Sequence, residues 1–466
     1  MRRPIMVTVL ALLTAPPAGA QTPGDTVRLT LDAAVRRALE QSEEIRLARA
    51  EVMDANGRVR EALSGALPQV TGSLAYTRQF ASIYQGAAED TSAIAKLFKN
   101  SPFGAPNAWS FQIQATQLLW SGGKVGAGLS AARSLRQSVQ LDEQETAADV
   151  AFRVKQAYLN AGYSAQLLAI AQENLAQARD HLREVQLYQR AGTRAEYDLL
   201  RAQVDAANQE PAVVAARNSY ELGVLELKRL VNVPAGQPLV LDTPLESPDA
   251  TIPVVATDSL GAPERAGLAA AEATVNVQQQ LLRAARADRW PTLSLATTYT
   301  EQAFPSNVFP AADQFRRGWN GELKLSFPIF LGFKTAGTIE RARAALLSAQ
   351  ARRDQAREQV ELEVAQARAE VERARALLVA RRATVRQAKR AHYLAGVRYA
   401  NGMATQLEVS DARVLTQQAE VNQVQATRDY LLALAQLERA LGRPVPVVRR
   451  SVEQVATGPN SGETQP

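Results

Sequence analysis

The feature that most constrains the fold of this chain is an internal duplication. Gly192 and Gly402 lie in similar short segments that are 210 residues apart (402 − 192 = 210). The same shift superimposes the segment 120–124 (WSGGK) on the segment 330–334 (FLGFK). The chain is therefore expected to contain two tandem copies of one structural unit.

The sequence pattern of each copy predicts, in this order, a helix, a strand, a loop, a second strand, a long helix, a tight turn and a return helix. The expected organisation is a signal peptide at 1–20, a first repeat at 21–232, a Pro-rich linker at 233–263, a second repeat at 264–444 and a partly disordered tail at 445–466. The first helices are expected at about 31–64 and 264–288, and the long helix hairpins at about 124–231 and 335–441. The predicted fold class is therefore mainly α, with a small β part.

A heptad pattern of apolar and small residues runs along the long helix of each copy. In the first copy its positions alternate in steps of four and three from Val150 to Val185, and adding 210 repeats the pattern except at Arg381 and His392. Such a seam predicts a coiled coil, in which the many alanines let helices approach closely. Each long helix is expected to extend roughly 95 Å, too far for a globule. Pro211 lies within the first return helix and is expected to kink or break it.

Four segments alternate between apolar and polar residues and predict strands. They are expected at about 67–78, 108–120, 291–302 and 318–330. Leu67 and Trp290 begin matching strands with a shift of 223 (290 − 67 = 223), so the two copies differ in length between their strands. A sheet with one polar face and one apolar face follows from this pattern.

The length and polarity of these strands favour a membrane barrel. Each strand has about ten residues, a polar second face and aromatic residues near its ends, which is typical of a transmembrane β-strand around a wet interior. A soluble sheet with one buried face shows the same alternation, but the predicted signal peptide and long helices favour the membrane. Because lipid does not tolerate open sheet edges, four strands must share a barrel with other copies of the chain.

The N-terminal residues have the pattern of a secretory signal peptide. Arg2 and Arg3 precede an apolar stretch at 5–15 and an Ala-Gly-Ala cleavage site at 18–20. The chain has no cysteine, which excludes disulfides, thiolate metal sites, a cysteine nucleophile and a lipid anchor on cysteine. Its 53 Lys and Arg residues are interleaved with 47 Asp and Glu residues, so nucleic acid is not an expected partner.

The chain resembles the TolC-like family of outer membrane efflux proteins over nearly its whole mature length. The resemblance is carried by the segments 34–42 (AVRRALEQS), 62–68 (ALSGALP) and 284–291 (AARADRWP), and by the Tyr399-x-x-Gly402 turn with acidic residues downstream. It implies a homotrimer with a twelve-stranded barrel in the outer membrane and a long α-helical coiled-coil tunnel through the periplasm. It also implies a periplasmic adaptor protein and an inner-membrane pump as partners, contact with outer-membrane lipid, and no cofactor.

The resemblance further assigns roles to the two turns that join paired helices. It implies adaptor-docking tips at Gly192, Thr193, Gly402, Met403, Ala404 and Thr405. It implies that Glu408 and Asp411, three residues apart on one helix face, surround a closed and cation-preferring entrance that Tyr399 helps to hold shut. Asp198, the counterpart of Glu408, and Arg194 are further candidates for contacts that keep the entrance closed. Ordinary hairpin chemistry, with glycine ending one helix and threonine capping the next, also accounts for the turns.

Two other classes of function compete with the channel. A soluble periplasmic coiled-coil adaptor or spacer would explain the helices and the signal peptide, but not four amphipathic strands with aromatic ends. An exported enzyme would need a catalytic motif, and the sequence has no Gly-rich phosphate loop, nucleophile motif or metal cluster. His181 and His392 are the only histidines and lie in predicted helices, so neither a metal site nor a catalytic site is expected.

Overall fold

The computed structural model describes residues 26–81, 105–193, 195–242, 253–254, 263–444 and 448–449. The predicted signal peptide, Arg194, most of the Pro-rich linker and most of the C-terminal tail lie outside these residues. The chain divides into two compact units, each built from three separate stretches. The first unit contains Met1–Ser42, Arg153–Ala250 and Ala376–Leu432, and the second contains Glu43–Phe152, Thr251–Arg375 and Ala433–Pro466.

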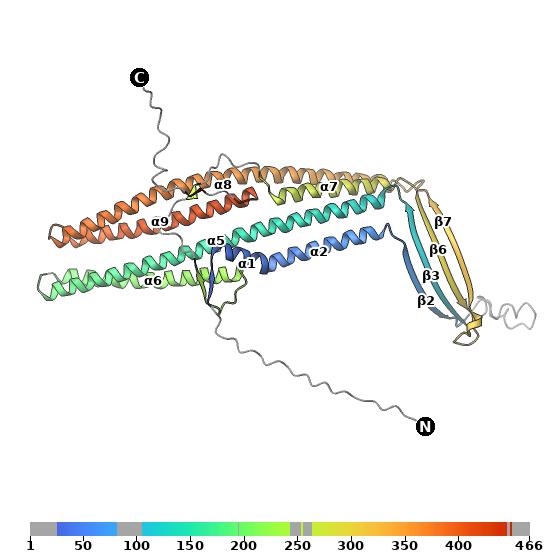
Figure 1. Cartoon of the computed structure of the whole chain (residues 1–466), viewed down its shortest axis with the longest axis horizontal. Helices are drawn as coiled ribbons and strands as arrows, with labels where there is room; N and C mark the ends of the chain where they lie inside the picture. The colour runs from blue at the N-terminus through green and yellow to red at the C-terminus, as the bar shows by residue number, and fades with distance from the viewer. Residues whose placement is uncertain are drawn as a thin grey trace, which may run out of the picture. The chain divides into compact units, whose positions relative to one another are not determined.

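The second unit contains one four-stranded antiparallel sheet, which Figure 1 shows with its strands side by side. Its strands are β2 (Gln69–Arg78), β3 (Asn107–Trp120), β6 (Thr292–Ala303) and β7 (Arg316–Ser326), in the order β2-β3-β6-β7. The first two strands come from the first repeat and the last two from the second. Strands β2 and β7 are therefore the two edges, and each has only one neighbour among the described residues.

The register of the sheet places most apolar residues on one face and most polar residues on the other. Leu74 pairs with Phe111, and Leu295 pairs with Leu323, whereas Thr71 pairs with Gln114 on the other face. The apolar face contains Val70, Leu74, Tyr76, Trp109, Phe111, Ile113, Leu293, Leu295, Tyr299, Trp319, Leu323 and Leu325. The polar face contains mostly Thr, Ser, Gln, Asn, Glu and Lys. Both edge strands are exposed along their whole length, so neither face is covered there.

The long helices repeat as closely as the sequence does. Helix α5 (Lys124–Arg190) and helix α8 (Lys334–Ala400) each have 67 residues, and their bounds differ by 210 (334 − 124 = 210). Helix α6 (Glu196–Leu230) and helix α9 (Gln406–Leu441) follow them after short turns. Figure 1 shows α6 beside α5 and α9 beside α8. Before the first strand of each repeat lies a shorter helix. It is α2 (Glu43–Ser64) in the first repeat and α7 (Ala266–Ala287) in the second.

The predicted heptad seam is largely buried. Its buried positions are Val150, Val154, Ala157, Ala161, Ala178 and Val185 in α5, and Val360, Val364, Ala367, Val371, Ala374, Leu378 and Val385 in α8. Alanine at so many of these positions lets backbones approach closely, as at Gly223 of α6, whose added Cβ would lie 3.4 Å from the Cα atom of Ala161. At Arg381 and His392 the second seam is only half-buried.

Two small strand pairs accompany these elements. In the first unit, β1 (Val27–Leu29) pairs in parallel with β4 (Leu239–Leu241), and the Tyr158 hydroxyl donates to the Leu29 carbonyl at 3.0 Å. In the second unit, β5 (Pro253–Val254) pairs antiparallel with β8 (Val448–Arg449). A short 3-10 helix, η2 (Ala312–Gln314), lies in the connection between β6 and β7. No helix in the described part of the chain is both long and apolar enough to cross a membrane.

The structure bears on two local expectations about helix continuity. The predicted helix at 31–64 is interrupted at Ser42, which has extended backbone (ψ 138°) and separates α1 (Leu31–Gln41) from α2. Serine favours helix caps, and Glu43 and Glu44 in the next turn favour a new N-terminus. Pro211 does not break α6, which continues through it. Pro211 is exposed, so water can satisfy the carbonyl that loses its hydrogen bond.

Candidate functional site

The two helix hairpins end in the same turn geometry. Gly192 and Gly402 both have φ +73°, a left-handed conformation that glycine adopts at low cost. In the first hairpin, the Thr193 amide donates to the Tyr188 carbonyl at 3.0 Å, and in the second, the Met403 amide donates to the Arg398 carbonyl at 2.8 Å. A second bond from each glycine amide completes a Schellman motif. Each tip is therefore fixed by its own backbone.

The second tip is reinforced by a capping box at the start of α9. The Glu408 amide donates to the Thr405 hydroxyl at 3.3 Å, and the Thr405 amide donates to a Glu408 carboxylate oxygen at 3.2 Å. The other carboxylate oxygen of Glu408 lies 3.4 Å from Arg398, which also donates to the Met403 carbonyl at 3.1 Å. Glu408 is thus held by its own hairpin. The Thr-x-x-Glu spacing in the sequence is the usual signature of this cap.

The first tip lacks an equivalent cap. Ala195 stands at the N-cap of α6 and makes no side-chain cap hydrogen bond. Asp198, the counterpart of Glu408, lies half-buried in the first turn of α6. A carboxylate at this position interacts favourably with the positive end of the helix dipole. Arg194 lies outside the described residues, so its role in contacts between neighbouring helix pairs that keep the entrance closed stays a prediction.

The other predicted entrance residues differ in exposure. Tyr399 is buried in the last turn of α8, and Ala404 is half-buried in the turn. Asp411 and Met403 are exposed. Asp411 has no ion pair or hydrogen bond to any other described side chain. Of the two predicted gate carboxylates, Glu408 therefore has an arginine partner, and Asp411 has none among the described residues.

A polar cluster that the sequence did not predict lies between the two helix hairpins, a few residues along the helices from the tips. Arg413 of α9 forms an ion pair with Asp205 of α6, with the arginine side chain mostly buried. The His181 ring of α5 and the Gln406 amide of α9 are 3.2 Å apart. These contacts join the first hairpin to the second through helices that are distant in sequence. Arg413 and Asp205 stand on separate helices with no shared motif, which is why pattern alone did not pair them.

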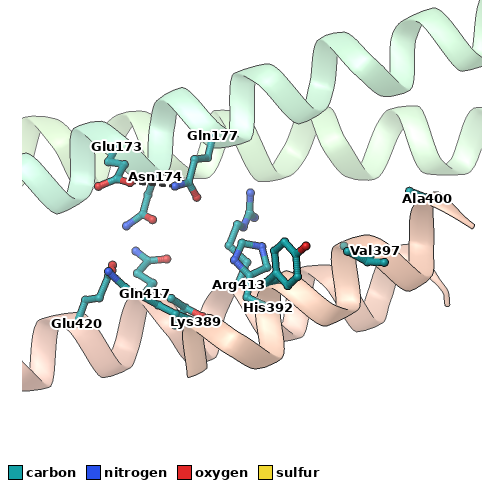
Figure 2. A pocket seen from close by; sticks show the side chains of 13 residues that line it. Glu173, Asn174, Gln177, Lys389, His392, Val397, Ala400, Arg413, Gln417 and Glu420 are labelled. Carbon is teal, nitrogen blue, oxygen red and sulfur yellow. Dashed lines mark hydrogen bonds and ion pairs between the residues drawn. The ribbon is translucent and has the colours of Figure 1, made fainter. Parts of the chain in front are cut away.

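The same cluster borders a groove between α5, α8 and α9. Figure 2 shows Asn174 and Gln177 of α5 facing Lys389, His392 and Arg413 across this groove, and Asn174 is buried. Burial lowers the pKa of His392 below the ordinary 6.5, and the positive charge of Arg413 lowers it further, against an opposite effect of Glu420. The interruption of the seam at His392 was the signal in the sequence that a polar layer replaces apolar packing here.

The described residues contain no group of three or more His, Cys, Asp or Glu side chains arranged to hold a metal ion. His181 and His392 both border one groove, but the carboxylates beside them are engaged with arginines or exposed. The described parts of the two tips are built from backbone turns, with a helix cap and an ion pair at the second tip.

Comparison with known proteins identifies the family. The model of a family described as outer membrane efflux protein matches residues 34–233 and 262–443, most of both repeats. The chain belongs to the outer membrane efflux protein family. A search of curated proteins by sequence found no match.

Solved structures of other proteins share the fold of this efflux protein. The outer membrane channel CmeC of Campylobacter jejuni is 18% identical, with a TM-score of 0.71 over 91% of this chain and 88% of that one. The outer membrane protein VceC of Vibrio cholerae is 20% identical, with a TM-score of 0.72 over 89% of this chain and 96% of that one. A membrane protein from Pseudomonas aeruginosa is 21% identical, with a TM-score of 0.73 over 88% and 93%.

These findings confirm the predicted fold class and the predicted family of outer-membrane efflux channels. They also confirm the outer membrane as the location of this efflux protein, which without a cysteine is not lipid-anchored through one. The alternative of a soluble periplasmic adaptor or spacer finds no support in the family match.

Proposed function

We propose that this outer membrane efflux protein forms a homotrimeric exit duct that passes substrates from a periplasmic adaptor and an inner-membrane pump to the outside. The observation that supports this proposal most directly is the sheet. Among the described residues each edge strand pairs on one side only, and the apolar face of the sheet is largely exposed. In lipid every backbone group needs a partner, so the sheet must close with other copies. Three copies would supply twelve strands, enough to surround a lumen.

The two faces of the sheet suit the two environments of a barrel wall. Leu74, Leu323 and Trp319 are exposed on the apolar face, where acyl chains would cover them. Glu322 and Lys324 point to the polar face, which would line the water-filled interior. A soluble sheet would instead cover the apolar face with its own helices, and β2 and β7 are exposed throughout.

The helical part of the chain also leaves apolar residues exposed at matching positions of the two repeats. Exposed pairs related by the 210-residue shift are Leu187 and Val397, Tyr197 and Leu407, and Val204 and Val414. Exposed apolar residues that gather into one patch often mark contacts between proteins. Their recurrence supports helix–helix contacts between copies, as a tunnel requires.

We place the adaptor contact and the gate at the two tips. Exposed turn residues at Gly192, Thr193, Gly402, Met403 and Thr405, with the half-buried Ala404, offer a docking surface of rigid backbone. Around the entrance, Asp411 supplies the free negative charge, and Glu408 adds a charge that Arg398 partly offsets. Tyr399, Asp198 and Arg194 are assigned to holding the entrance closed, and no catalytic role is assigned to any residue.

The first test is membrane fractionation followed by single-channel conductance in a planar bilayer. We expect the protein in the outer membrane, with a small, mostly closed and cation-preferring conductance. A protein that remains in the soluble periplasmic fraction and forms no pore would overturn the proposal.

The gate assignment is tested separately by ion selectivity. Asp411→Asn is expected to reduce the preference for cations more than Glu408→Gln, since Gln can still accept the capping hydrogen bond while Arg398 already offsets the charge it removes. Glu40→Gln, at an exposed carboxylate of α1, is the control for a general loss of negative charge. Unchanged selectivity in Asp411→Asn would show that this residue does not face the pore.

A further inference from the structure

The four helix ends that adjoin the sheet carry an excess of positive charge. Figure 1 shows α2, α5, α7 and α8 reaching the strands at these ends, and all four ends belong to the second unit. The ten residues on the helix side of each junction are 57–66, 124–133, 281–290 and 334–343. Together they contain ten Lys and Arg residues and three acidic residues, a net charge of +7 (10 − 3 = 7). We call the Lys and Arg residues of these four segments the collar.

The excess of positive charge is confined to this short length of helix. The next ten residues of each helix, at 47–56, 134–143, 271–280 and 344–353, contain four Lys and Arg residues and five acidic residues. Ten residues of helix span about 15 Å. A lipid headgroup layer is roughly 5–8 Å thick, and a surface charge acts over about 8 Å more in physiological salt. The collar therefore has the depth over which a membrane surface attracts cations.

The collar is a property of the repeated unit. The shift of 210 that relates the long helices, and the shift of 223 that relates the shorter ones, each superimpose collar cations on collar cations. Three pairs recur at matching positions, namely Arg60 and Arg283, Lys124 and Lys334, and Arg133 and Arg343. None of the three acidic residues in the four segments has an acidic counterpart in the other repeat. The positive charge is therefore distributed over both halves of the unit and not gathered in one segment.

Most of the collar has no acidic partner. Arg58 forms an ion pair with Asp54, and Lys124 forms one with Asp288. The remaining eight cations (10 − 2 = 8) are exposed and form no ion pair with any residue that the structure describes. Copies of the chain would add their collars to one another, so an oligomer increases the excess of charge. The partner that neutralises the collar must therefore come from outside the protein.

Helix energetics explain only part of the collar. Cations are favoured at the C-terminal ends of helices, which α2 and α7 present to the sheet. Helices α5 and α8 present their N-terminal ends instead, where the helix dipole disfavours cations. Lys124 and Lys334 nevertheless begin these helices, and neither first turn contains an acidic residue. An external anion would offset this unfavourable placement.

Aromatic residues place the collar next to the apolar part of a bilayer. Trp120 and Trp290 stand where the strands meet the helices, 44% and 60% exposed, and their rings meet edge to face at 6.4 Å between centroids. Phe330 and Phe333 are exposed at the matching junction of the second repeat. Tryptophan concentrates at the level of lipid headgroups because its ring is apolar and its indole N–H is polar. The collar therefore begins where this aromatic layer ends.

We propose that the collar binds the anionic headgroups of phospholipids, such as phosphatidylglycerol, in the periplasmic leaflet of the outer membrane. The inference uses the outer-membrane location and rests on the proposed function for the insertion of the sheet in the bilayer. Guanidinium groups donate paired hydrogen bonds to phosphate oxygens. Phosphatidylglycerol has a net negative charge, whereas phosphatidylcholine carries a cation beside its phosphate. Each Lys or Arg close to an anionic lipid surface strengthens binding roughly fivefold.

Quenching of tryptophan fluorescence by brominated lipids tests the proposal at the junction itself. The chain has four tryptophans, and Trp109→Phe with Trp319→Phe leaves only Trp120 and Trp290 as reporters. This protein is reconstituted into phosphatidylcholine vesicles that contain a minor fraction of brominated phosphatidylglycerol or, in a parallel sample, the same fraction of brominated phosphatidylcholine. We expect phosphatidylglycerol to associate at least about fivefold more strongly than phosphatidylcholine, and added salt to weaken this preference.

A variant of the same protein removes four collar cations that have no ion pair among the described residues. Its substitutions are Arg60→Gln, Arg133→Gln, Arg283→Gln and Arg343→Gln. The preference for phosphatidylglycerol should fall at least about fivefold, the effect expected for one cation at an anionic surface. The glutamines keep the exposed helix faces polar, so we expect the helical content to be unchanged.

The matched control removes the same number of positive charges from the first unit. Its four arginines are also exposed and form no ion pair with a described residue, and its substitutions are Arg28→Gln, Arg36→Gln, Arg217→Gln and Arg386→Gln. The control should keep the preference for phosphatidylglycerol, because these arginines lie outside the collar. It separates binding at the collar from a general effect of net charge.

The outcomes distinguish this proposal from the channel itself. A preference for phosphatidylglycerol that is lost in the collar variant and kept in the control would support the proposal. No preference in the protein with an intact collar, or equal losses in the two variants, would overturn it, and conductance of that protein in a planar bilayer would leave the channel standing. A protein that neither inserts into vesicles nor conducts would overturn both.

Discussion

Replacing Arg265 by methionine is expected to lower the free energy of unfolding of the helical part by about 3 kcal/mol. Arg265 precedes α7 and joins α5 to α8. Its guanidinium donates to Glu145 at 2.8 Å and to Glu363 at 2.6 Å, and the Gly267 amide donates to Glu145 at 3.0 Å. The arginine side chain is only 9% exposed, against 20% for Glu145 and 30% for Glu363.

The magnitude follows from what the substitution leaves behind. Methionine has a similar volume and fills the space, but two part-buried carboxylates lose the cation that both of them contact. Removing one partner of a buried ion pair costs about 3–5 kcal/mol, and the residual exposure of both carboxylates places this site at the lower end. Changing Glu145 and Glu363 to glutamine in the same variant removes the stranded charges and should recover at least half of the loss.

The assay is chemical denaturation in detergent, followed by circular dichroism at about 222 nm, where the helices dominate the signal. Arg373→Met is the matched control, because Arg373 forms an exposed ion pair with Glu370 on one helix. Exposed pairs of this type contribute about 0.2–1 kcal/mol, so the control should change little. Equal losses in the Arg265 and Arg373 variants, or no recovery with the two glutamines, would refute the reasoning.

The same site predicts a dependence on pH. Burial raises the pKa of Glu363, but hydrogen bonds from Gln359 and Arg265, with the charges of Arg265 and Arg439, outweigh it and hold that pKa below 4.5. When folding lowers the pKa of a carboxyl group, the group stabilises the folded protein fully at any pH above its pKa in the unfolded chain. This stabilisation is lost as the pH falls through the pKa of the group in the folded protein. Glu363→Gln should therefore lose less stability below about pH 4.5 than the natural protein does.

Three further predictions concern single positions. Gly122→Ala should lower the denaturation midpoint far more than Gly123→Ala, because only the first adds a Cβ 2.6 Å from the Trp290 Cβ, although both have positive φ. Gly402→Ala should cost about 1–2 kcal/mol in the same assay, as φ +73° is strained for alanine. His392 has a lowered pKa, so its contribution to stability is present above pH 6.5 and lost as pH falls through its folded pKa. His392→Gln should therefore show a smaller decline in stability between about pH 7 and 5 than the natural protein.

The sequence predicted those features that depend on period and repetition. Alternation along β7 is set by the pleat of a strand, so the face of each residue from Trp319 to Leu325 followed directly from the pattern. The seam from Val150 to Val185 was likewise predictable, because heptad spacing fixes which helix face is buried. The 210-residue shift carried both predictions from one half of the chain to the other.

The sequence did not predict features that depend on one residue or on distant partners. The spacing of Thr405 and Glu408 matched a helix cap as well as a gate, and only the hydrogen bonds show that the cap engages Glu408. The pairing of Arg413 with Asp205 requires knowing which helices meet. The helical periodicity of the sequence continues on both sides of Ser42, yet the helix ends there at a single cap residue. Helix propensity alone does not predict the position of such an end.

The hairpin of β2 and β3 and the hairpin of β6 and β7 have the same register, which shows where the length of the chain has changed between the two repeats. The shifts of 223 and 210 differ by 13 residues (223 − 210 = 13), and the whole difference lies in the connection between β2 and β3. Length was gained or lost there without displacing one strand pair, as loop-closure entropy grows slowly with loop length. Connections between strands tolerate such changes in length more readily than the strands themselves do. The connection can therefore change in length while the duplicated strands keep one register.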